Sequence, residues 1–466
     1  MSESGSKPLS RWSSSILLFL WLGTAVLSGC SDHPPGGEES RGAPHASAVE
    51  EPDKSRDRLA FDGCDLLLIS IDTLRADHLP AYGYDRIETP ALDALKAESV
   101  FFAQARTQAM VTAPSHMTML TSIYPHVHQV KNLSLEKGKS FTVLPASMET
   151  LAEVLKRNGY RTAAFTDGGN VSPLLGFSRG FETFDALNEG ISIKIYKAHE
   201  YLKERRPDEK LFIFLHTYEV HDYLDAPAFE KIRFNPDAGG MLLAEKKTLQ
   251  AYDDRIRECD RVLQWFFRKL KDAGRYENMM IVFTSDHGEN FYEHGYLGHF
   301  QFFRETAHVP LLLRLPGGAQ GGRTIDLPVG LVDLMPTVLD LMSIQGPGTM
   351  QGRSLVDPIR GRPCDLQPVF GSRLGSPLGY SVYYEGYTLI HDPAFRPPIH
   401  SLFETRTDLD EKTDLSAARP GPFKQLDALT RKHIRECERL AEQLGAGDSK
   451  KLLDDALIEE LKRLGY

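Results

Sequence analysis

Five short apolar runs, separated by stretches of helical periodicity, limit the folds that this chain can adopt. Each run is four to seven residues long. Runs of this length between helices are typical of strands in a mainly parallel sheet, because helices on both faces of such a sheet bury all the side chains of its strands. The sequence therefore predicts an α/β fold. The predicted strands are 66–71, 162–165, 211–215, 279–283 and 309–315.

The predicted helices between these strands have clear periods and stop signals. Leu151, Val154 and Leu155 share one helical face, and Gly159 follows them as a stop. A longer period runs over 249–273 and also ends at a glycine. With 466 residues, of which 41% are hydrophobic, the chain is long enough for one large α/β domain and a smaller one.

Acidic and histidine residues follow three of the predicted strands. Asp72 comes directly after the first run, His216 follows the third, and Asp286 and His287 follow the fourth. In open α/β sheets the carboxyl ends of the strands form the ligand-binding edge. A single aspartate after a strand is commonly a turn residue. Two aspartates and a histidine at one edge, however, make an oxygen-rich site suited to Mn²⁺, Zn²⁺ or Ca²⁺.

Blocks of sequence around these residues resemble the sulfatase family, a branch of the alkaline-phosphatase superfamily. The block around Asp72 resembles the first strand and helix of the family, and Thr112-Ala113-Pro114-Ser115-His116 resembles its nucleophile motif. The resemblance covers nearly all of the chain after residue 60, and chance does not explain the number and order of the blocks. They are 71–79, 82–84, 89–93, 112–116, 119–121, 214–216, 252–253, 284–289, 293–295, 308–311 and 331–337.

The resemblance implies an alkaline-phosphatase-like fold, in which helices sandwich a mainly parallel sheet and a small antiparallel subdomain follows at the C-terminus. We therefore expect a sulfatase-like catalytic domain over residues 60–350 and a C-terminal subdomain with a helical tail over 351–466. The charged, amphipathic tail at 426–464 either packs on its own domain or pairs with another chain. The oligomeric state stays open.

The residue at the nucleophile position departs from the family pattern. Sulfatases carry a cysteine or serine there that is oxidised to formylglycine, whereas this chain carries Thr112. A secondary alcohol cannot yield the aldehyde, so no formylglycine is expected. Thr112 can still attack directly if a metal lowers the pKa of its hydroxyl and a helix N-terminus stabilises the alkoxide. The alternative is that Thr112 is only the N-cap of a helix.

The resemblance also implies a set of metal ligands. One divalent ion, Ca²⁺, Mn²⁺ or Zn²⁺, is expected on Asp72, Thr112, Asp286 and His287. A second ion is not expected, because Thr217 stands where the two-zinc phosphodiesterases of the superfamily carry an aspartate.

Three histidines complete the expected site. His116 takes the place of the arginine that supports the nucleophile in sulfatases. His221 and His299 are placed like family residues that bind the anion or protonate the leaving group. Two family features are replaced: Thr73 stands for the second aspartate of an Asp-Asp pair, and 166–169 stands for a Gly-Lys-x-His segment that contacts the sulfate.

We therefore predict a metal-dependent hydrolase of an anionic ester, either a sulfate ester or a phosphoester, with Thr112 as its nucleophile. Two alternatives stay open: a transferase that passes a phospho-group to an acceptor in the cell envelope, and a catalytically silent sulfatase-like binding protein. The overall resemblance favours sulfate. Thr112 favours phosphate or phosphodiester, because the phosphoryl-transferring relatives use threonine.

The N-terminus predicts export and lipid anchoring. Two basic residues precede an apolar run at 16–27, which is typical of a signal peptide and short for a bilayer-spanning helix of about 20 residues. The run ends in Leu-Ser-Gly-Cys30, which resembles the lipobox of bacterial lipoproteins. We expect a signal peptide at 1–29, membrane attachment through lipidated Cys30, and a flexible tether at 30–59. The expected location is the cell envelope, on the periplasmic side or at the outer membrane.

The net charge bears on nucleic-acid binding, and the cysteine spacing bears on zinc binding, redox motifs and disulfides. The net charge of −10 gives no general reason to expect nucleic-acid binding, because such proteins usually carry a basic stripe for the phosphates, so nucleic acid is not an expected partner. The four cysteines after Cys30 are far apart and form no Cys-x-x-Cys spacing, so neither a zinc knuckle nor a redox motif is predicted. Disulfides and isolated thiols both stay open.

Overall fold

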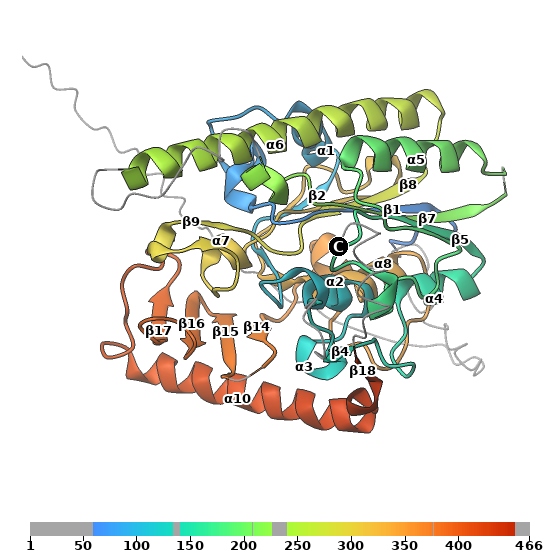
Figure 1. The fold of residues 1–466 in the computed structure, drawn as a ribbon. Helices are drawn as coiled ribbons and strands as arrows, with labels where there is room; N and C mark the ends of the chain where they lie inside the picture. The colour runs from blue at the N-terminus through green and yellow to red at the C-terminus, as the bar shows by residue number, and fades with distance from the viewer. Residues whose placement is uncertain (1–58, 134–139, 207, 226–239, 376, 453–466) are drawn as a thin grey trace, which may run out of the picture. The chain divides into compact units, whose positions relative to one another are not determined.

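A computed structural model describes residues 59–133, 140–206, 208–225, 240–375 and 377–452 (Figure 1). The predicted signal peptide, Cys30 and nearly all of the predicted tether lie outside these residues. Among the described residues, no helix combines the length and apolarity needed to cross a bilayer.

The central feature is an eight-stranded mixed sheet in which all five predicted strands take part. Most neighbours run parallel, including β1 with β7 and β8, whereas β11 runs antiparallel to both of its neighbours. The predicted α/β class with a mainly parallel sheet is therefore confirmed. In order across the sheet, the strands are β12 (Thr324–Ile325), β2 (Val100–Phe102), β11 (Leu311–Arg314), β8 (Met279–Thr284), β1 (Asp65–Ile71), β7 (Lys210–Thr217), β5 (Tyr160–Phe165) and β6 (Thr183–Asp185).

Helices cover both faces of this sheet (Figure 1). Leu66 and Leu68 of β1 point into one buried cluster, and Leu67 and Ile69 point into the other, because successive side chains of a strand alternate between faces. The helices α1 (Pro90–Ala97), α5 (Ile191–Lys203) and α6 (Gly240–Asp272) lie on one face, and α2 (Thr112–Thr121), α4 (Leu151–Arg157) and α8 (Leu334–Leu341) lie on the other.

A second, four-stranded antiparallel sheet forms the C-terminal part, as predicted. It comprises β14 (Val369–Arg373), β15 (Gly379–Tyr384), β16 (Tyr387–Asp392) and β17 (Ile399–Glu404). The helix α10 (Pro420–Gln443) packs against this sheet, with Leu426 and Ile434 in the buried cluster. The described part of the amphipathic tail therefore packs on its own domain. The domain boundary at 350 stays a prediction.

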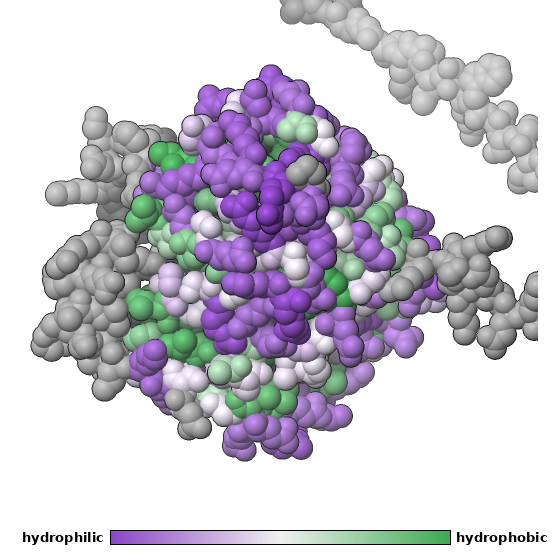
Figure 2. Space-filling model, turned by 90° about the vertical axis from the view of Figure 1, so that its right-hand side faces the viewer, coloured by the Kyte–Doolittle hydropathy of each residue, from purple (hydrophilic) through white to green (hydrophobic). Residues whose placement is uncertain are grey.

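The shorter elements connect these two sheets or lie at their edges. They are β3 (Ala105–Arg106), β4 (Ser140–Thr142), β9 (Asn290–Phe291), β10 (Leu297–Gly298), β13 (Val329–Gly330), β18 (Lys450–Leu452), α3 (Pro125–His128), α7 (Arg304–Ala307) and α9 (Val356–Ile359). The face of the molecule in Figure 2 is mainly hydrophilic, with smaller, separate hydrophobic areas. None of the four cysteines in the described part forms a disulfide.

Candidate active site

The candidate site lies at the carboxyl ends of three adjacent strands, β7, β1 and β8. Ser70 of β1 pairs with His216 of β7 on one side and with Thr284 of β8 on the other. Asp72 and Asp286 each follow two residues after this level of the sheet. The sheet order therefore brings the two aspartates together. The loops that carry them are also hydrogen-bonded: the Thr73 N–H donates to Asp286 Oδ1 at 3.2 Å, although 213 residues separate the two in the sequence.

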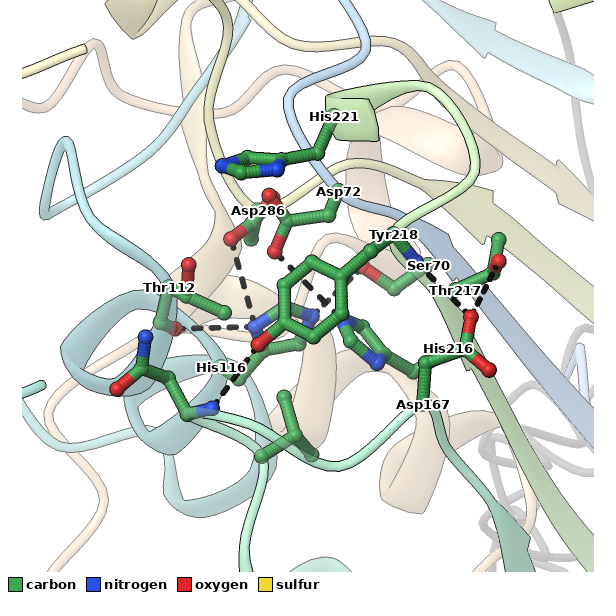
Figure 3. A network of polar contacts seen from close by, with 12 residues as sticks. Ser70, Asp72, Thr112, His116, Asp167, His216, Thr217, Tyr218, His221 and Asp286 are labelled. Carbon is green, nitrogen blue, oxygen red and sulfur yellow. Dashed lines mark hydrogen bonds and ion pairs between the residues drawn. The ribbon is translucent and has the colours of Figure 1, made fainter. Parts of the chain in front are cut away.

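Thr112 lies at the start of α2, beside Asp72 (Figure 3). Val111 is the N-cap of this helix, and Thr112 is its first helical residue. The alternative that Thr112 is only an N-cap is therefore wrong. Burial raises the pKa of Asp72, whereas the charges of His221 and His299 and a hydrogen bond from the Thr112 side chain act to lower it. The buried Thr112 hydroxyl thus faces a carboxylate.

Asp72, Asp286 and His287 each have one buried ligand atom without a hydrogen-bond partner among the described residues: Asp72 Oδ1, Asp286 Oδ2 and His287 Nε2. The three side chains can place one ligand atom each within 4.8 Å of the other two. Since His287 Nδ1 donates to the Gly288 carbonyl at 2.9 Å, its Nε2 carries a lone pair. Buried polar atoms normally have partners, so this set fits a divalent cation.

The pKa values of Asp286 and His287 also fit a bound cation. Burial and the neighbouring charge of Asp72 raise the pKa of Asp286 to about 8. Burial lowers the pKa of His287 well below its ordinary value, so this ring is neutral. Two buried carboxylates side by side are stable in ionised form only next to a positive charge.

A second group, Asp72, His116 and His216, is also close enough to hold an ion. His116 is completely buried, and its Nδ1 donates to the Thr112 carbonyl at 3.0 Å while its Nε2 accepts from the Ser70 hydroxyl at 2.9 Å. Its ring nitrogens are therefore already engaged. His216 lies 3.5 Å from Asp72 through Nε2. Of the two groups, the one with three unpaired ligand atoms is the better metal site, and His116 supports the first turn of α2 from below.

His221 and His299 lie at the more exposed side of the aspartate pair. Their ring centroids are 5.6 Å apart, and His299 is 4.4 Å from the ring of His287. Burial lowers the pKa of His221, but Asp222, Asp72 and Glu289 outweigh it and raise the pKa to about 9. The pKa of His299 is also raised: Glu289, which lies 3.2 Å from its Nδ1, outweighs burial. Both rings can therefore carry a proton near a bound ester.

Two backbone features fix the side chains of the candidate metal site. Thr73 has φ of 58°, a strained value for a β-branched residue, and is held there because its carbonyl accepts from the Tyr252 hydroxyl at 2.6 Å. A Cβ at Gly288 would lie 1.9 Å from the Glu305 carbonyl oxygen. Only glycine lets the loop after His287 approach α7 this closely.

The structure adds residues that the sequence interpretation did not assign to the site. Ser70 and His216 form a layer below the metal-binding side chains, and Glu289 supports His299. Glu289 belongs to the block 284–289 that resembles the sulfatase family, so this resemblance could have assigned it to the site. Thr217, in place of the aspartate of the two-zinc enzymes, donates to Asp167 Oδ2 at 2.7 Å and is thus engaged in a loop contact.

Comparison with known proteins places the chain in a family. The Sulfatase family model matches residues 65–344, which contain every candidate site residue. An ulvan-active sulfatase from Formosa agariphila is 26% identical over 338 residues, which cover 63% of this chain and 65% of that protein. The match thus spans less than two thirds of that sulfatase. An arylsulfatase from Clostridium perfringens is 24% identical over 384 residues, covering 64% of this chain and 78% of that protein.

Solved structures share the fold. A phosphonate monoester hydrolase of Agrobacterium radiobacter superposes with a TM-score of 0.64 at 18% identity, covering 82% of this chain and 96% of that one. A 2-O GAG sulfatase superposes with a TM-score of 0.69 at 18% identity, covering 85% and 96%. Both likenesses confirm the predicted alkaline-phosphatase-like architecture. Since the family match covers more than half of the chain, the protein belongs to the sulfatase family.

Proposed function

We propose that the protein hydrolyses sulfate esters or phosphoesters, with Thr112 as the nucleophile. The observation that carries this proposal is the position of the buried Thr112 hydroxyl, at the first residue of α2 and beside Asp72, one of three side chains with unpaired ligand atoms. An anionic ester placed over these residues meets a nucleophile on one side and two histidines on the other.

The side chains divide the reaction between them. Asp72, Asp286 and His287, with Thr112, would hold one divalent ion, which when bound neutralises the carboxylates and attracts the anionic ester. The Thr112 hydroxyl gives its proton to the Asp72 carboxylate to which it is hydrogen-bonded, and its oxygen attacks sulfur or phosphorus, aided by its place at a helix N-terminus. The bond to the leaving oxygen breaks, and His221 or His299 gives that oxygen a proton. Water then gives a proton to the same histidine and attacks the sulfur or phosphorus, the bond to the Thr112 oxygen breaks, and this oxygen takes back its proton from Asp72 as the sulfate or phosphate product leaves.

His116 acts differently in this proposal. Burial lowers its pKa to about 4, so the ring is neutral, and both ring nitrogens are engaged by Thr112 and Ser70. A ring held in this way cannot exchange a proton with substrate. We assign it a positioning role, in which it fixes the Thr112 backbone.

The choice between sulfate and phosphate rests on two opposing features. Relatives of this chain include an ulvan-active sulfatase and an arylsulfatase, which favours a sulfate ester as the substrate. Thr112 has no route to formylglycine, and a directly attacking threonine favours a phosphoester. The phosphonate monoester hydrolase that shares this fold is named for a substrate that contains phosphorus and not sulfur.

The function is tested with the full-length protein, stripped of metal and reloaded separately with Ca²⁺, Mn²⁺ or Zn²⁺. Each form is assayed on an aryl sulfate, an aryl phosphate monoester and an aryl phosphodiester, beside Thr112→Ala. Turnover of at least one ester that disappears in Thr112→Ala is the expected result. Turnover that survives in this variant contradicts the proposed nucleophile, and no turnover with any metal contradicts the hydrolase.

We also propose that Cys30 is lipidated and attaches the protein to the cell envelope, with residues 60–350 as the catalytic domain and 351–466 as the C-terminal subdomain. The support is the lipobox-like sequence that ends at Cys30. In a bacterial host fed radiolabelled fatty acid, the full chain should take up label and fractionate with membranes. Cys30→Ala should lose the label, and a wild-type chain without label would contradict the anchor.

A further inference from the structure

A cavity of about 330 Å³ lies between β3, the start of α7 and the C-terminal sheet. It shares no lining residue with the candidate active site. Its volume is roughly ten times that of one liquid water molecule, which leaves room for a small charged group. The residues that give it its charge are Arg106, His308, Arg304, Arg406 and Asp326.

Arg106 and His308 lie side by side at the base of the cavity. They form an isolated antiparallel bridge, flanked by hydrogen bonds from the Thr107 N–H to the Ala307 carbonyl and from the Val309 N–H to the Ala105 carbonyl, both 3.0 Å. Each is only 7% exposed. Their positions are therefore set by the backbone and not by a flexible surface loop.

The Arg106 guanidinium is buried without an ion pair to any described residue, and its Nε has no hydrogen-bond partner among them. It lies over the ring of Tyr383, whose centroid is 4.1 Å from Cζ. Glu411 is the described carboxylate whose charge acts most on Arg106, but the two do not come within ion-pair distance. A buried cation in this state is costly unless an anion reaches it.

His308 adds a second unpaired atom. Its Nε2 donates to the Ala103 carbonyl at 2.9 Å, and its Nδ1 is buried without a partner among the described residues. Nδ1 is thus the atom left to interact with a group in the cavity. Burial and the charges of Arg304 and Arg106 lower the pKa of His308 to about 3, so Nδ1 keeps its lone pair and accepts a hydrogen bond from water or from a hydroxyl of the bound group.

The remaining charges around the cavity are mostly positive. Arg304 lies 3.6 Å from Asp77 Oδ2, and exposed Arg406 has no ion pair with a described residue. Asp326 is the only carboxylate that lines the cavity, and its Oδ1 already accepts from Gln104 Nε2 at 2.7 Å. Three guanidinium groups therefore face a cavity with one engaged carboxylate.

We propose that this cavity is an oxyanion site, which binds a sulfate or phosphate group either as the free ion or as part of an anionic polymer. Guanidinium groups bind such oxygens through paired, charge-assisted hydrogen bonds. Arg106 supplies the fixed, desolvated donor, and exposed Arg406 lines the cavity as a second guanidinium. The site is separate from Thr112 and stands whether or not the proposed hydrolysis occurs.

Equilibrium dialysis of the full-length protein with radiolabelled sulfate tests the site, with Arg396→Ala as a control at an exposed arginine outside the cavity. Arg406→Ala should weaken one class of bound sulfate about tenfold, and Arg106→Gln should abolish that class. Turnover of a small aryl ester should stay unchanged in Arg406→Ala. Sulfate binding that is the same in wild type, Arg406→Ala and Arg106→Gln would overturn the proposal.

Two further arms complete the experiment. If Arg106→Gln does not fold, Arg406→Glu replaces it, because this exposed position tolerates substitution, and unchanged sulfate binding in Arg406→Glu would then overturn the proposal. Competition with a sulfated oligosaccharide and its desulfated counterpart separates the two sources of the oxyanion. Displacement by the sulfated oligosaccharide at lower concentration than by inorganic sulfate identifies a polymer-borne group, and equal concentrations identify the free ion.

Discussion

His287 Nε2 lies 3.2 Å from Asp286 Oδ2, and neither atom has a hydrogen-bond partner among the described residues. Since the proton of the His287 ring is on Nδ1, a nitrogen lone pair and a carboxylate oxygen face each other in a buried site. This arrangement is unfavourable on its own and becomes favourable when both atoms bind one cation.

Asp286→Asn should therefore remove most of the bound divalent metal. The amide cannot replace a carboxylate charge, and the remaining ligands hold the ion more weakly. Metal content after dialysis, measured by elemental mass spectrometry, checks this. Asp272→Asn changes an exposed aspartate of α6 and should leave the metal content unchanged. Equal metal in wild type and Asp286→Asn would mean that the ion binds elsewhere.

Thr112→Ser should retain turnover, whereas Thr112→Ala should lose it by roughly a thousandfold or more, because the alanine has no attacking oxygen. Thermal unfolding should change little in Thr112→Ser, which keeps the hydroxyl that hydrogen-bonds to Asp72, whereas Thr112→Ala loses this bond and should be less stable by about 1 kcal/mol. Steady-state kinetics on the best substrate measure the effect. A large loss in Thr112→Ser with an unchanged fold would argue against direct attack by a hydroxyl.

Asp222→Asn should shift the alkaline limb of the pH–rate profile to lower pH by about one unit. The pKa of His221 is raised to about 9, with burial opposing the rise and Asp222 contributing to it. As a proton donor, His221 works below its pKa and fails above it, so a lower pKa moves the loss of activity to lower pH. An alkaline limb that does not move assigns the proton to another group, and His299→Gln is then the variant to compare.

Gly288→Ala should destabilise the protein by about 3 kcal/mol, because a Cβ there overlaps the backbone of α7 and neither segment can move freely. Gly348→Ala is the matched control, since a Cβ at Gly348 meets nothing within 4 Å, and its cost should stay within about 0.5 kcal/mol. Chemical denaturation of both variants provides the comparison. Equal stabilities would show that the loop after His287 is more adaptable than its close approach implies.

Much of the fold follows from local pattern. All five apolar runs became strands of the main sheet, because their length and continuous hydrophobicity suit a sheet covered on both faces. The direction of β11 could not be read in the same way. Its run resembles those of the parallel strands, and hydrophobic pattern carries no information on strand direction.

The candidate site was partly readable for the same reason. Asp72 and Asp286 stand at strand ends, and adjacent strands bring such residues together. His116 was assigned to the site through the family resemblance, whereas Ser70 and His216 were not assigned, because their contacts with His116 depend on how α2 packs below the sheet edge. The left-handed backbone of Thr73 is likewise set by a tertiary contact from Tyr252.

The most direct test of the account is a search for the esterified nucleophile. The full-length, metal-loaded protein is mixed with the best aryl ester, quenched in acid within the first turnovers and digested for peptide mass spectrometry. The account predicts a phosphoryl or sulfuryl group on Thr112, absent from Thr112→Ala and from protein without substrate. Active enzyme whose Thr112 stays unmodified in every quenched sample, or a group found on another residue, would contradict the account.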